Sequence, residues 1–302
     1  MYTVNADFVH TFAGNPLDRG QHLRKDEAAL QALQNASSSR FLLFHQLKVA
    51  TQAAGQLAWI SHDEVPVAPR QLVFLGLDNG EGRFAASVEE DTCVGSIAAF
   101  SDCRQAVAAL SAAEGGIVSQ ARAMLDWHQR NPFCAVCGNP SRASRGGQVR
   151  QCDHCNKHVF PRTDPVAIML IQNDTRGDYC LLGKSQGRMA QSNFYSALAG
   201  FVDQGESLEE AVRREVMEEA GITVGPVSYH SSQPWPFPSS LMIGCHGIAL
   251  NQDIVIDTEE MADVAWFDRN QVLSAIAGDN PDLRIPGAGA IAHHLIKAWA
   301  NA

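Results

Sequence analysis

Apolar and polar positions along this chain follow two kinds of spacing, one typical of strands and one typical of helices. Apolar runs predict strands at 40–50, 71–77, 165–174 and 178–185. Helices are predicted within 18–34 and 111–129, from Leu208 onward, and at 289–300. Strand and helix signals alternate, so the pattern predicts a fold of the α/β class.

Turn residues separate several of these elements. Asn79-Gly80 suits positive φ and predicts the tip of a hairpin over 77–87, and residues 175–177 predict a second turn. With 302 residues, of which 45% are hydrophobic, the chain can form two domains or one large one.

Composition divides the chain into three expected regions. Residues 1–130 read as an N-terminal α/β domain without a catalytic motif, which we expect to be a scaffold or an interface. Residues 131–162 are short, polar and rich in cysteine, and 163–302 read as a second α/β domain.

The formal net charge of -10 argues against a protein that coats DNA, although it leaves room for a local basic site. The first residues lack the basic and apolar regions of a signal peptide. Apolar runs such as 166–171 are far too short to span a bilayer. We therefore expect a cytoplasmic protein that does not enter a membrane.

Four of the eight cysteines form a cluster, and its spacing is Cys134-x2-Cys137-x14-Cys152-x2-Cys155. Paired CxxC motifs predict a tetrahedral zinc site, for which the alternatives are two disulfides or a redox motif. Four thiolates leave no open coordination position, so this zinc would be structural. The remaining cysteines are predicted to be small buried residues: Cys93, Cys103, Cys180 and Cys245. We expect His154 and His158 to be surface residues, not ligands.

The cysteine-rich region is also locally basic, with one acidic residue, Asp153, against Arg142, Arg145, Arg150, Lys157 and Arg162. These side chains form either an ordinary solvated surface or a contact patch for a chain of phosphates.

A helix rich in carboxylates follows residue 207. Ser207 and Glu210 form a capping box that starts it, and Gly221 ends it. Glu215, Glu218 and Glu219 are spaced to share one face. Their crowding should push at least one of them toward protonation unless a hard divalent cation such as Mg²⁺ or Mn²⁺ is bound.

The wider pattern resembles the Nudix box at every defined position. The matching residues are Gly200-x5-Glu206-x7-Arg214-Glu215-Val216-x-Glu218-Glu219-x-Gly221-Ile222. The resemblance implies a metal-dependent hydrolase of linked nucleoside diphosphates, with an α/β/α sandwich around a mixed sheet. This sandwich would follow a zinc ribbon and the α/β N-terminal domain.

A proline-rich loop, Ser232–Ser240 with the sequence SQPWPFPSS, lies outside the box. Prolines restrict a loop to few conformations, so it loses little entropy on binding. The loop is similar to the substrate motif of the NADH pyrophosphatase subfamily, of the NudC type. The ribbon and the phrase FPRTDPVAIMLI at 160–171 also match this subfamily.

The resemblance implies roles for particular residues. The catalytic set would be Glu215, Glu218, Glu219 and Glu260, with Glu259 as the rival of Glu260. The Mg²⁺ or Mn²⁺ ligands would be the Ala199 carbonyl, Glu215, Glu219 and Glu260. Substrate would be bound by Phe160, Phe201, Gln233, Pro234, Trp235, Pro236, Phe237, Pro238, Ser239, Ser240 and Ala292. Trp235 could instead lie at a dimer interface, and Phe160 replaces a more usual tyrosine. Arg214 would orient the carboxylates of the box, and Glu206 would either orient Arg214 or fix the loop.

These positions imply hydrolysis of NAD or NADH to nicotinamide mononucleotide and AMP, removal of NAD caps from RNA, and a homodimer. Two alternatives remain. One is a Nudix enzyme for another dinucleotide, such as ADP-ribose or a diadenosine polyphosphate. The other is a non-catalytic regulator that binds nucleic acid.

Overall fold

The computed structural model describes residues 9–65, 71–89, 95–174, 176–187 and 190–302. Cys93 and Thr175, which the sequence analysis names, lie outside them. The chain divides into two compact units. The N-terminal unit is Thr11–Thr163 with Pro234–Ser239, and the C-terminal unit is Met1–His10, Asp164–Gln233 and Ser240–Ala302. Each unit is described by itself.

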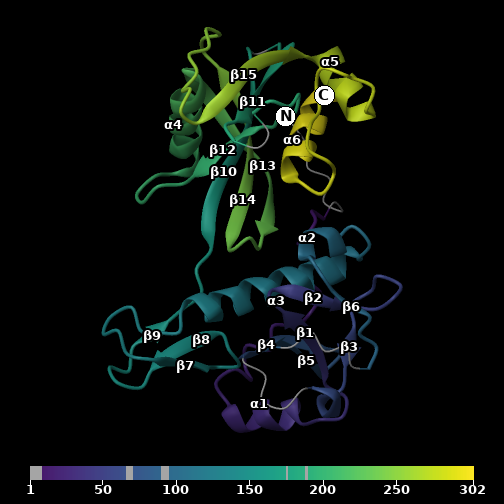
Figure 1. Ribbon diagram of the computed structural model, residues 1–302. Coiled ribbons are helices and arrows are strands. Elements are labelled where there is room, and N and C mark those ends of the chain that lie inside the picture. The colour runs from purple at the N-terminus through teal and green to yellow at the C-terminus, as the bar shows by residue number, and fades with distance from the viewer. Residues whose placement is uncertain (1–8, 66–70, 90–94, 175, 188–189) are drawn as a thin grey trace. The chain divides into compact units, whose positions relative to one another are not determined.

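The N-terminal unit contains a sheet in the order β4-β5-β1-β2-β6, with β3 paired to β1. Its strands are β1 (Arg40–His45), β2 (Lys48–Thr51), β3 (Trp59–Ile60), β4 (Gln71–Asp78), β5 (Glu81–Val88) and β6 (Ala99–Ser101). Its helices are α1 (Glu27–Gln34), α2 (Cys103–Ala106), α3 (Ala112–Arg130) and the short 3-10 turn His62–Glu64. Figure 1 shows α3 and α2 along one side of this sheet and α1 on the other.

Several expected elements are confirmed here, and one is corrected. Asn79 and Gly80 both have positive φ, 49° and 87°, and they turn β4 into β5. The run 40–50 is two antiparallel strands, not one, because Gln46 and Leu47 form a turn with φ of 49° and 62°. Neither residue type is a usual turn former, so the sequence carried no signal for this break.

The cysteine-rich segment forms a three-stranded sheet of its own, in the order β7-β8-β9. The strands are β7 (Ser141–Ser144), β8 (Val149–Cys152) and β9 (His158–Val159). Gly147, in the turn between β7 and β8, hydrogen-bonds through its carbonyl to His128 of α3, at 2.6 Å. The ribbon is therefore anchored on the last turns of that helix.

The C-terminal unit is built on a mixed sheet in the order β13-β14-β10-β11-β15, with β12 paired to β10. Its strands are β10 (Asp164–Gln172), β11 (Tyr179–Ser185), β12 (Leu198–Phe201), β13 (Val224–Trp235), β14 (Ser240–Ala249) and β15 (Met261–Asp268). β10 runs parallel to β14 and antiparallel to β11 and β12.

Helices cover both faces of this sheet (Figure 1). On one face, α4 (Leu208–Ala220) buries Val212 and Val216 against alternate residues of β10, such as Met169. On the other face, α5 (Arg269–Ala277) and α6 (Ile291–Ala300) pack against the intervening residues of β10, such as Leu170. This period-two alternation gives each face its own core, and the predicted α/β/α sandwich with a mixed sheet is confirmed.

One short segment departs from the order of the chain. Most of β13 and all of β14 belong to the C-terminal unit, but Pro234–Ser239, which is the end of β13 and the turn to β14, belongs to the N-terminal unit. The predicted loop is therefore corrected: residues 232–235 continue β13, Ser240 begins β14, and only residues 236–239 form a turn. Among the described residues, no helix is long and apolar enough to cross a membrane.

Candidate active site and metal centre

The helix α4 begins and ends as its sequence predicts. The Ser207 side chain accepts a hydrogen bond from the Glu210 backbone, and the Glu210 carboxylate accepts one from the Ser207 backbone at 2.7 Å. Gly221 ends the helix in the left-handed region, with φ of 67°. A rigid helix capped at both ends fixes the direction of the carboxylates that it carries.

Arg214 connects the carboxylates of this region. Its Nε and Nη2 donate to the two oxygens of Glu206, at 2.6 and 2.9 Å. Its Nη1 donates to Glu215 at 2.8 Å and to Glu218 at 2.9 Å, and Nη2 also donates to the Phe201 carbonyl at 2.9 Å. The bond to Arg214 and the Asp203 N–H lower the pKa of Glu206 to about 2. The structure thus gives Arg214 the orienting contacts that the sequence suggested.

Gly200 creates the space in which Glu215 lies. A Cβ atom at Gly200 would be 1.9 Å from the Cδ of Glu215 and 2.1 Å from each carboxylate oxygen. Gly200 lies in β12 and is paired with Ala167 of β10. The Glu215 carboxylate therefore lies directly against the backbone of β12. The neighbouring Ala199, whose carbonyl is a predicted ligand, is exposed in the same strand.

Glu219 is the most deeply buried carboxylate of the set, with 8% of its surface exposed. Its Oε2 is buried and has no hydrogen-bond partner among the residues that the structure describes. Burial raises the pKa of Glu219 to about 8, and repulsion from Glu215, Glu260 and Glu218 adds to the shift. Burial also raises the pKa of Glu215. A buried, unpaired carboxylate among others of the same charge is the donor set that a hard divalent cation fits.

Glu260 is distinguished from its neighbour Glu259 by these charges. The carboxylate of Glu260 is among the groups that raise the pKa of both Glu215 and Glu219, whereas that of Glu259 is not. The Glu260 backbone is fixed, since its carbonyl accepts from the Gln186 N–H at 2.8 Å. The electrostatics therefore favour Glu260 as the carboxylate from outside the helix.

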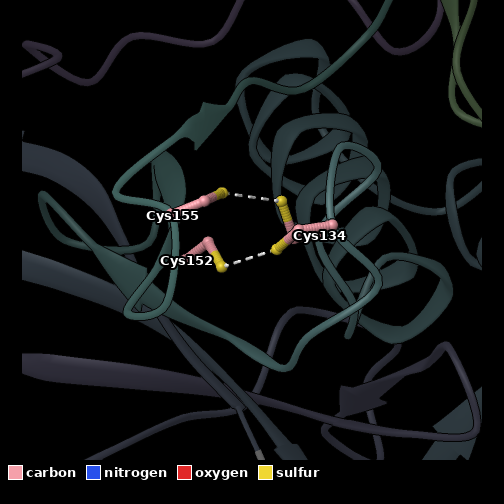
Figure 2. Close-up of side chains that lie close together, drawn as sticks. Cys134, Cys152 and Cys155 are labelled. Carbon is pink, nitrogen blue, oxygen red and sulfur yellow. Dashed lines mark hydrogen bonds between the residues drawn. The ribbon is translucent and has the colours of Figure 1, made fainter.

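The four clustered cysteines converge on one point, with their sulfur atoms all within 4.8 Å of one another. The Sγ atoms face one another in pairs across a small gap (Figure 2): those of Cys134 and Cys155 are 3.6 Å apart, and those of Cys137 and Cys152 are 3.5 Å apart. Hydrogen bonds from the Asn139 backbone and side chain lower the pKa of Cys137 to about 6.

The two CxxC knuckles share one backbone geometry. The residues after the second cysteine of each pair, Gly138 and Asn156, have φ of 74° and 55°. Their N–H groups donate to the carbonyls of Cys134 and Cys152, both at 2.9 Å. Two matching knuckles with converged sulfurs form a donor set that suits a tetrahedral Zn²⁺. No histidine joins this group among the described residues.

The predicted basic patch of the ribbon is corrected at Arg150. This side chain is only 9% exposed, and it donates to the Ser141 side chain at 2.9 Å and to His128 Nδ1 at 3.1 Å. Arg142 is exposed but paired with Asp153 at 2.9 Å. Arg150 therefore stabilises the ribbon from inside and does not form part of its surface, because its guanidinium donates to protein acceptors and not to water.

The aromatic residues of the proline-rich loop pack on the N-terminal unit. Trp235 and Phe237 are partly buried against its core. Each of the two rings packs edge to face with the ring of Phe12, and the centroid of Phe12 is 5.7 Å from that of Trp235 and 5.5 Å from that of Phe237. Arg104 and Arg122 lie over the Phe237 ring at 4.2 and 4.3 Å. These three partners could not be predicted from the sequence, because each lies more than a hundred residues from the loop and carries no local signal.

Gln233 and Ala292 are buried near the base of the loop. Gln233 is 1% exposed, and its amide is held by the Gly289 carbonyl at 2.9 Å and the Ile291 N–H at 2.8 Å. Both hydrogen-bonding atoms of the amide are therefore directed at protein groups and not at solvent. Ala292 is 3% exposed, in the first turn of α6.

The remaining predicted substrate residues are more accessible. Phe201 and Phe160 are 59% and 58% exposed, which is unusual for phenylalanine and leaves a ring face of each available for stacking. Pro238 is exposed, Pro236 is buried, and Pro234, Ser239 and Ser240 are half-buried. Phe160 belongs to the N-terminal unit and Phe201 to the C-terminal unit.

A cavity of about 600 Å³ lies elsewhere in the C-terminal unit, between β13, β14 and the start of α5. Its two arginines already have partners, since Arg176 pairs with Asp174 at 3.1 Å and Arg269 donates to the Gly177 carbonyl at 3.0 Å. None of the predicted site residues is among the described residues that line it.

A mixed sheet with a capped carboxylate helix on one face, and a buried acid in the last turn of that helix, is the arrangement that the Nudix box predicts. The family model "NUDIX domain" matches residues 161–285, and the model "NADH pyrophosphatase-like rudimentary NUDIX domain" matches residues 38–127. The mouse protein "NAD(P)H pyrophosphatase NUDT13, mitochondrial" is 32% identical over 322 residues, which cover 92% of this chain and 88% of that protein. The chain therefore belongs to the Nudix hydrolase family.

Other relatives match more closely over a shorter length. "NAD-capped RNA hydrolase NUDT12" of Macaca fascicularis is 44% identical over 195 residues, 62% of this chain and 42% of that protein. "NAD-capped RNA hydrolase NudC" of Mycobacterium bovis is 39% identical over 191 residues, 61% of this chain and 60% of that protein. The chain spans about half the length of the first curated relatives that it matches.

Proposed function

We propose that this protein hydrolyses the pyrophosphate bond of NAD and NADH to give nicotinamide mononucleotide and AMP. It would also remove NAD caps from RNA, with nicotinamide mononucleotide and 5'-monophosphate RNA as the products. The observation that carries the proposal is the unpaired, buried Glu219 among Glu215, Glu218 and Glu260, within a Nudix box. The names of the NUDT12, NUDT13 and NudC relatives support this substrate class.

Glu215, Glu219, Glu260 and the Ala199 carbonyl would hold Mg²⁺ or Mn²⁺. These ions, when bound, neutralise the diphosphate and activate the attacking water. Arg214 holds Glu215 and Glu218 in place, and Glu206 holds Arg214 through two hydrogen bonds. The zinc held by Cys134, Cys137, Cys152 and Cys155 would have a structural role, because four thiolates leave no coordination position for substrate.

Substrate recognition would fall to the proline-rich loop and to the exposed rings of Phe201 and Phe160. An exposed phenyl face offers stacking to nicotinamide or adenine without the loss of a buried contact. Ser239 and Ser240 would offer hydroxyl groups to phosphate or ribose. Ala292 would contribute shape to a base pocket, through the packing of α6.

We also propose that the protein is cytoplasmic and acts as a homodimer, with Trp235 either in the substrate pocket or at the dimer interface. Both statements follow from the subfamily resemblance, and size-exclusion chromatography with light scattering tests the dimer. A monomeric mass at micromolar concentration would exclude a stable dimer.

The proposed reaction is tested with NADH, NAD, ADP-ribose and NAD-capped RNA in parallel, each with Mg²⁺ and with Mn²⁺. We expect turnover of NADH and capped RNA to exceed that of ADP-ribose, with nicotinamide mononucleotide as a common product. A preference for ADP-ribose would favour an enzyme for another dinucleotide, and no turnover with any substrate would favour a non-catalytic regulator.

Glu219→Gln provides the first prediction for this reaction. The substitution keeps the size of the side chain and removes its charge, so the fold should survive while turnover falls by at least ~100-fold, the scale of charge stabilisation by catalytic metals. Glu209→Gln, at an exposed position of the same helix, is the matched control and should stay near wild type. Near-normal turnover of Glu219→Gln would place the metal site elsewhere.

A further inference from the structure

The Phe237 side chain of the proline-rich loop lies between two arginines of the N-terminal unit. The guanidinium of Arg104 is 4.2 Å from the centre of the ring, and that of Arg122 is 4.3 Å from it. Arg122 also donates a hydrogen bond to the carbonyl of Pro236, the residue just before Phe237. One arginine thus holds both the ring and the backbone of the loop.

Two further rings complete this group. Phe12 and Trp235 each meet Phe237 edge to face, with centroids 5.5 and 5.4 Å away, and Arg104 is also 5.6 Å from the centre of Trp235. Phe12 is 2% exposed and belongs to the core of the N-terminal unit. We call Phe12, Arg104, Arg122, Trp235 and Phe237 the arginine–aromatic cluster.

Two helices of the N-terminal unit carry the arginines of this cluster. Arg122 lies in the middle of α3, between the buried residues Ala121 and Leu125. Arg104 follows Asp102, whose carboxylate caps α2 by accepting from the Arg104 N–H at 2.9 Å. An arginine guanidinium can stack on the face of an aromatic ring and form a cation–π interaction with it. Two such contacts restrict the tilt of one ring.

Two positive charges on one ring repel each other, and nearby groups offset this repulsion. The negative charges of Asp102 and Asp126 attract the guanidinium of Arg122. A loop that needed only apolar packing would not require this arrangement, because an aliphatic pocket would bury Phe237 without assembling cations.

We propose that Arg104 and Arg122 are positioning residues for substrate recognition: they hold Phe237 from the N-terminal unit and thereby fix the conformation of the proline-rich loop. This inference rests on the proposed function, since it assigns a task to that loop. Neither arginine is required to touch substrate. The rudimentary N-terminal domain then contributes to recognition through the loop that it holds, while the carboxylates of α4 keep the chemistry.

Steady-state kinetics with NADH test the proposal in a double-mutant cycle of Arg122→Leu, Phe237→Leu and the pair. A mobile loop weakens substrate binding but leaves the carboxylates in place, so KM should rise about fivefold, or about 1 kcal/mol, with kcat within about twofold. The double variant should cost no more than either single one, because both remove the same contact. Phe237→Tyr, which keeps the ring, should restore KM.

Lys25→Leu is the matched control, since it removes a positive charge from an exposed position of the same unit. Its KM should equal that of the wild type. Three results would each overturn the proposal in favour of a general effect on stability: additive effects in the cycle, a fall of kcat as large as the rise of KM in the single variants, or a raised KM in Lys25→Leu.

Fluorine NMR of protein labelled with 5-fluorotryptophan separates this proposal from the proposed reaction. The Trp235 resonance, assigned by its absence in Trp235→Phe, should shift and sharpen in Arg122→Leu and in Phe237→Leu, but not in Lys25→Leu. An unchanged resonance would refute the positioning role even if NADH is hydrolysed. A shifted resonance in a protein that leaves NADH intact would retain the role of the arginines in holding the loop and refute the reaction.

Discussion

Gly200 is the residue at which the site leaves least space. The strand β12 passes so close to α4 that the carboxylate of Glu215 occupies the volume of a missing side chain. Its backbone dihedrals do not require glycine, since Gly200 is not among the residues with positive φ. The glycine at the start of the Nudix box is therefore explained here by the close approach of a carboxylate to a strand.

Gly200→Ala should displace Glu215 and reduce turnover of NADH by about 10-fold or more, on the scale expected when a catalytic group is misplaced by an ångström. Gly287→Ala is its control, because a Cβ atom there meets no other atom within 4 Å. Kinetics together with circular dichroism check this prediction. A folded Gly200→Ala protein with normal turnover would show that Glu215 can move without consequence.

At the scale of elements, α3 and the ribbon are joined through a buried histidine. His128 is 1% exposed, and it lies between the Gly147 carbonyl and the guanidinium of Arg150. Burial lowers the pKa of His128 to about 4, and the positive charge of Arg150 adds to this effect. The neutral imidazole accepts from Arg150 at one nitrogen and donates to Gly147 at the other.

This contact predicts how stability depends on pH. Because the folded pKa of His128 is below the unfolded value of 6.5, the unfolded chain binds more protons between these values. The stability that His128 contributes should be fully present above pH 6.5 and should fall as pH drops toward about 4. Thermal melts of wild type and His128→Gln across this range check it, and parallel curves would contradict it.

The ribbon itself should depend on zinc. We expect about one tightly held zinc per chain in protein purified without chelator, and its loss in Cys152→Ser. That substitution should unfold the ribbon and lower the melting temperature, because Cys152 is fully buried at the convergence of the four thiolates. Metal analysis and melting curves measure both effects, with Cys245→Ser, a buried cysteine in β14, as a control for lost packing. A zinc content unchanged by Cys152→Ser would refute the four-thiolate site.

Local signals explain which elements could be predicted from the sequence. The capping box at Ser207 and the left-handed Gly221 lie within one helix, so α4 was predictable from neighbouring residues alone. The turn at Gln46 and Leu47 was not, because both residues have positive φ although neither residue type is a usual turn former. Arg150 was expected on the surface, and only its distant partner His128 shows why it is buried. The contacts of Phe237 likewise come from helices far away in the chain.

At the scale of the whole molecule, two units each have their own cores, and zinc would belong to one of them. We therefore expect two calorimetric transitions, of which a zinc chelator lowers the one that belongs to the N-terminal unit. The C-terminal transition should respond instead to Mg²⁺ or Mn²⁺. A single transition that moves as a whole with chelator would show that the units unfold together.

The exchange of Pro234–Ser239 between the units has a consequence for synthesis on the ribosome. Thr11–Thr163 is translated before β10, α4 and most of β13, yet part of its packing is supplied by a segment that is translated after them. Until then the nascent N-terminal unit exposes Phe12 without the rings of Trp235 and Phe237. We expect this exposed apolar surface to bind chaperones or to associate prematurely with other chains. Translation order thus makes Pro234–Ser239 the last part of the N-terminal unit to be synthesised.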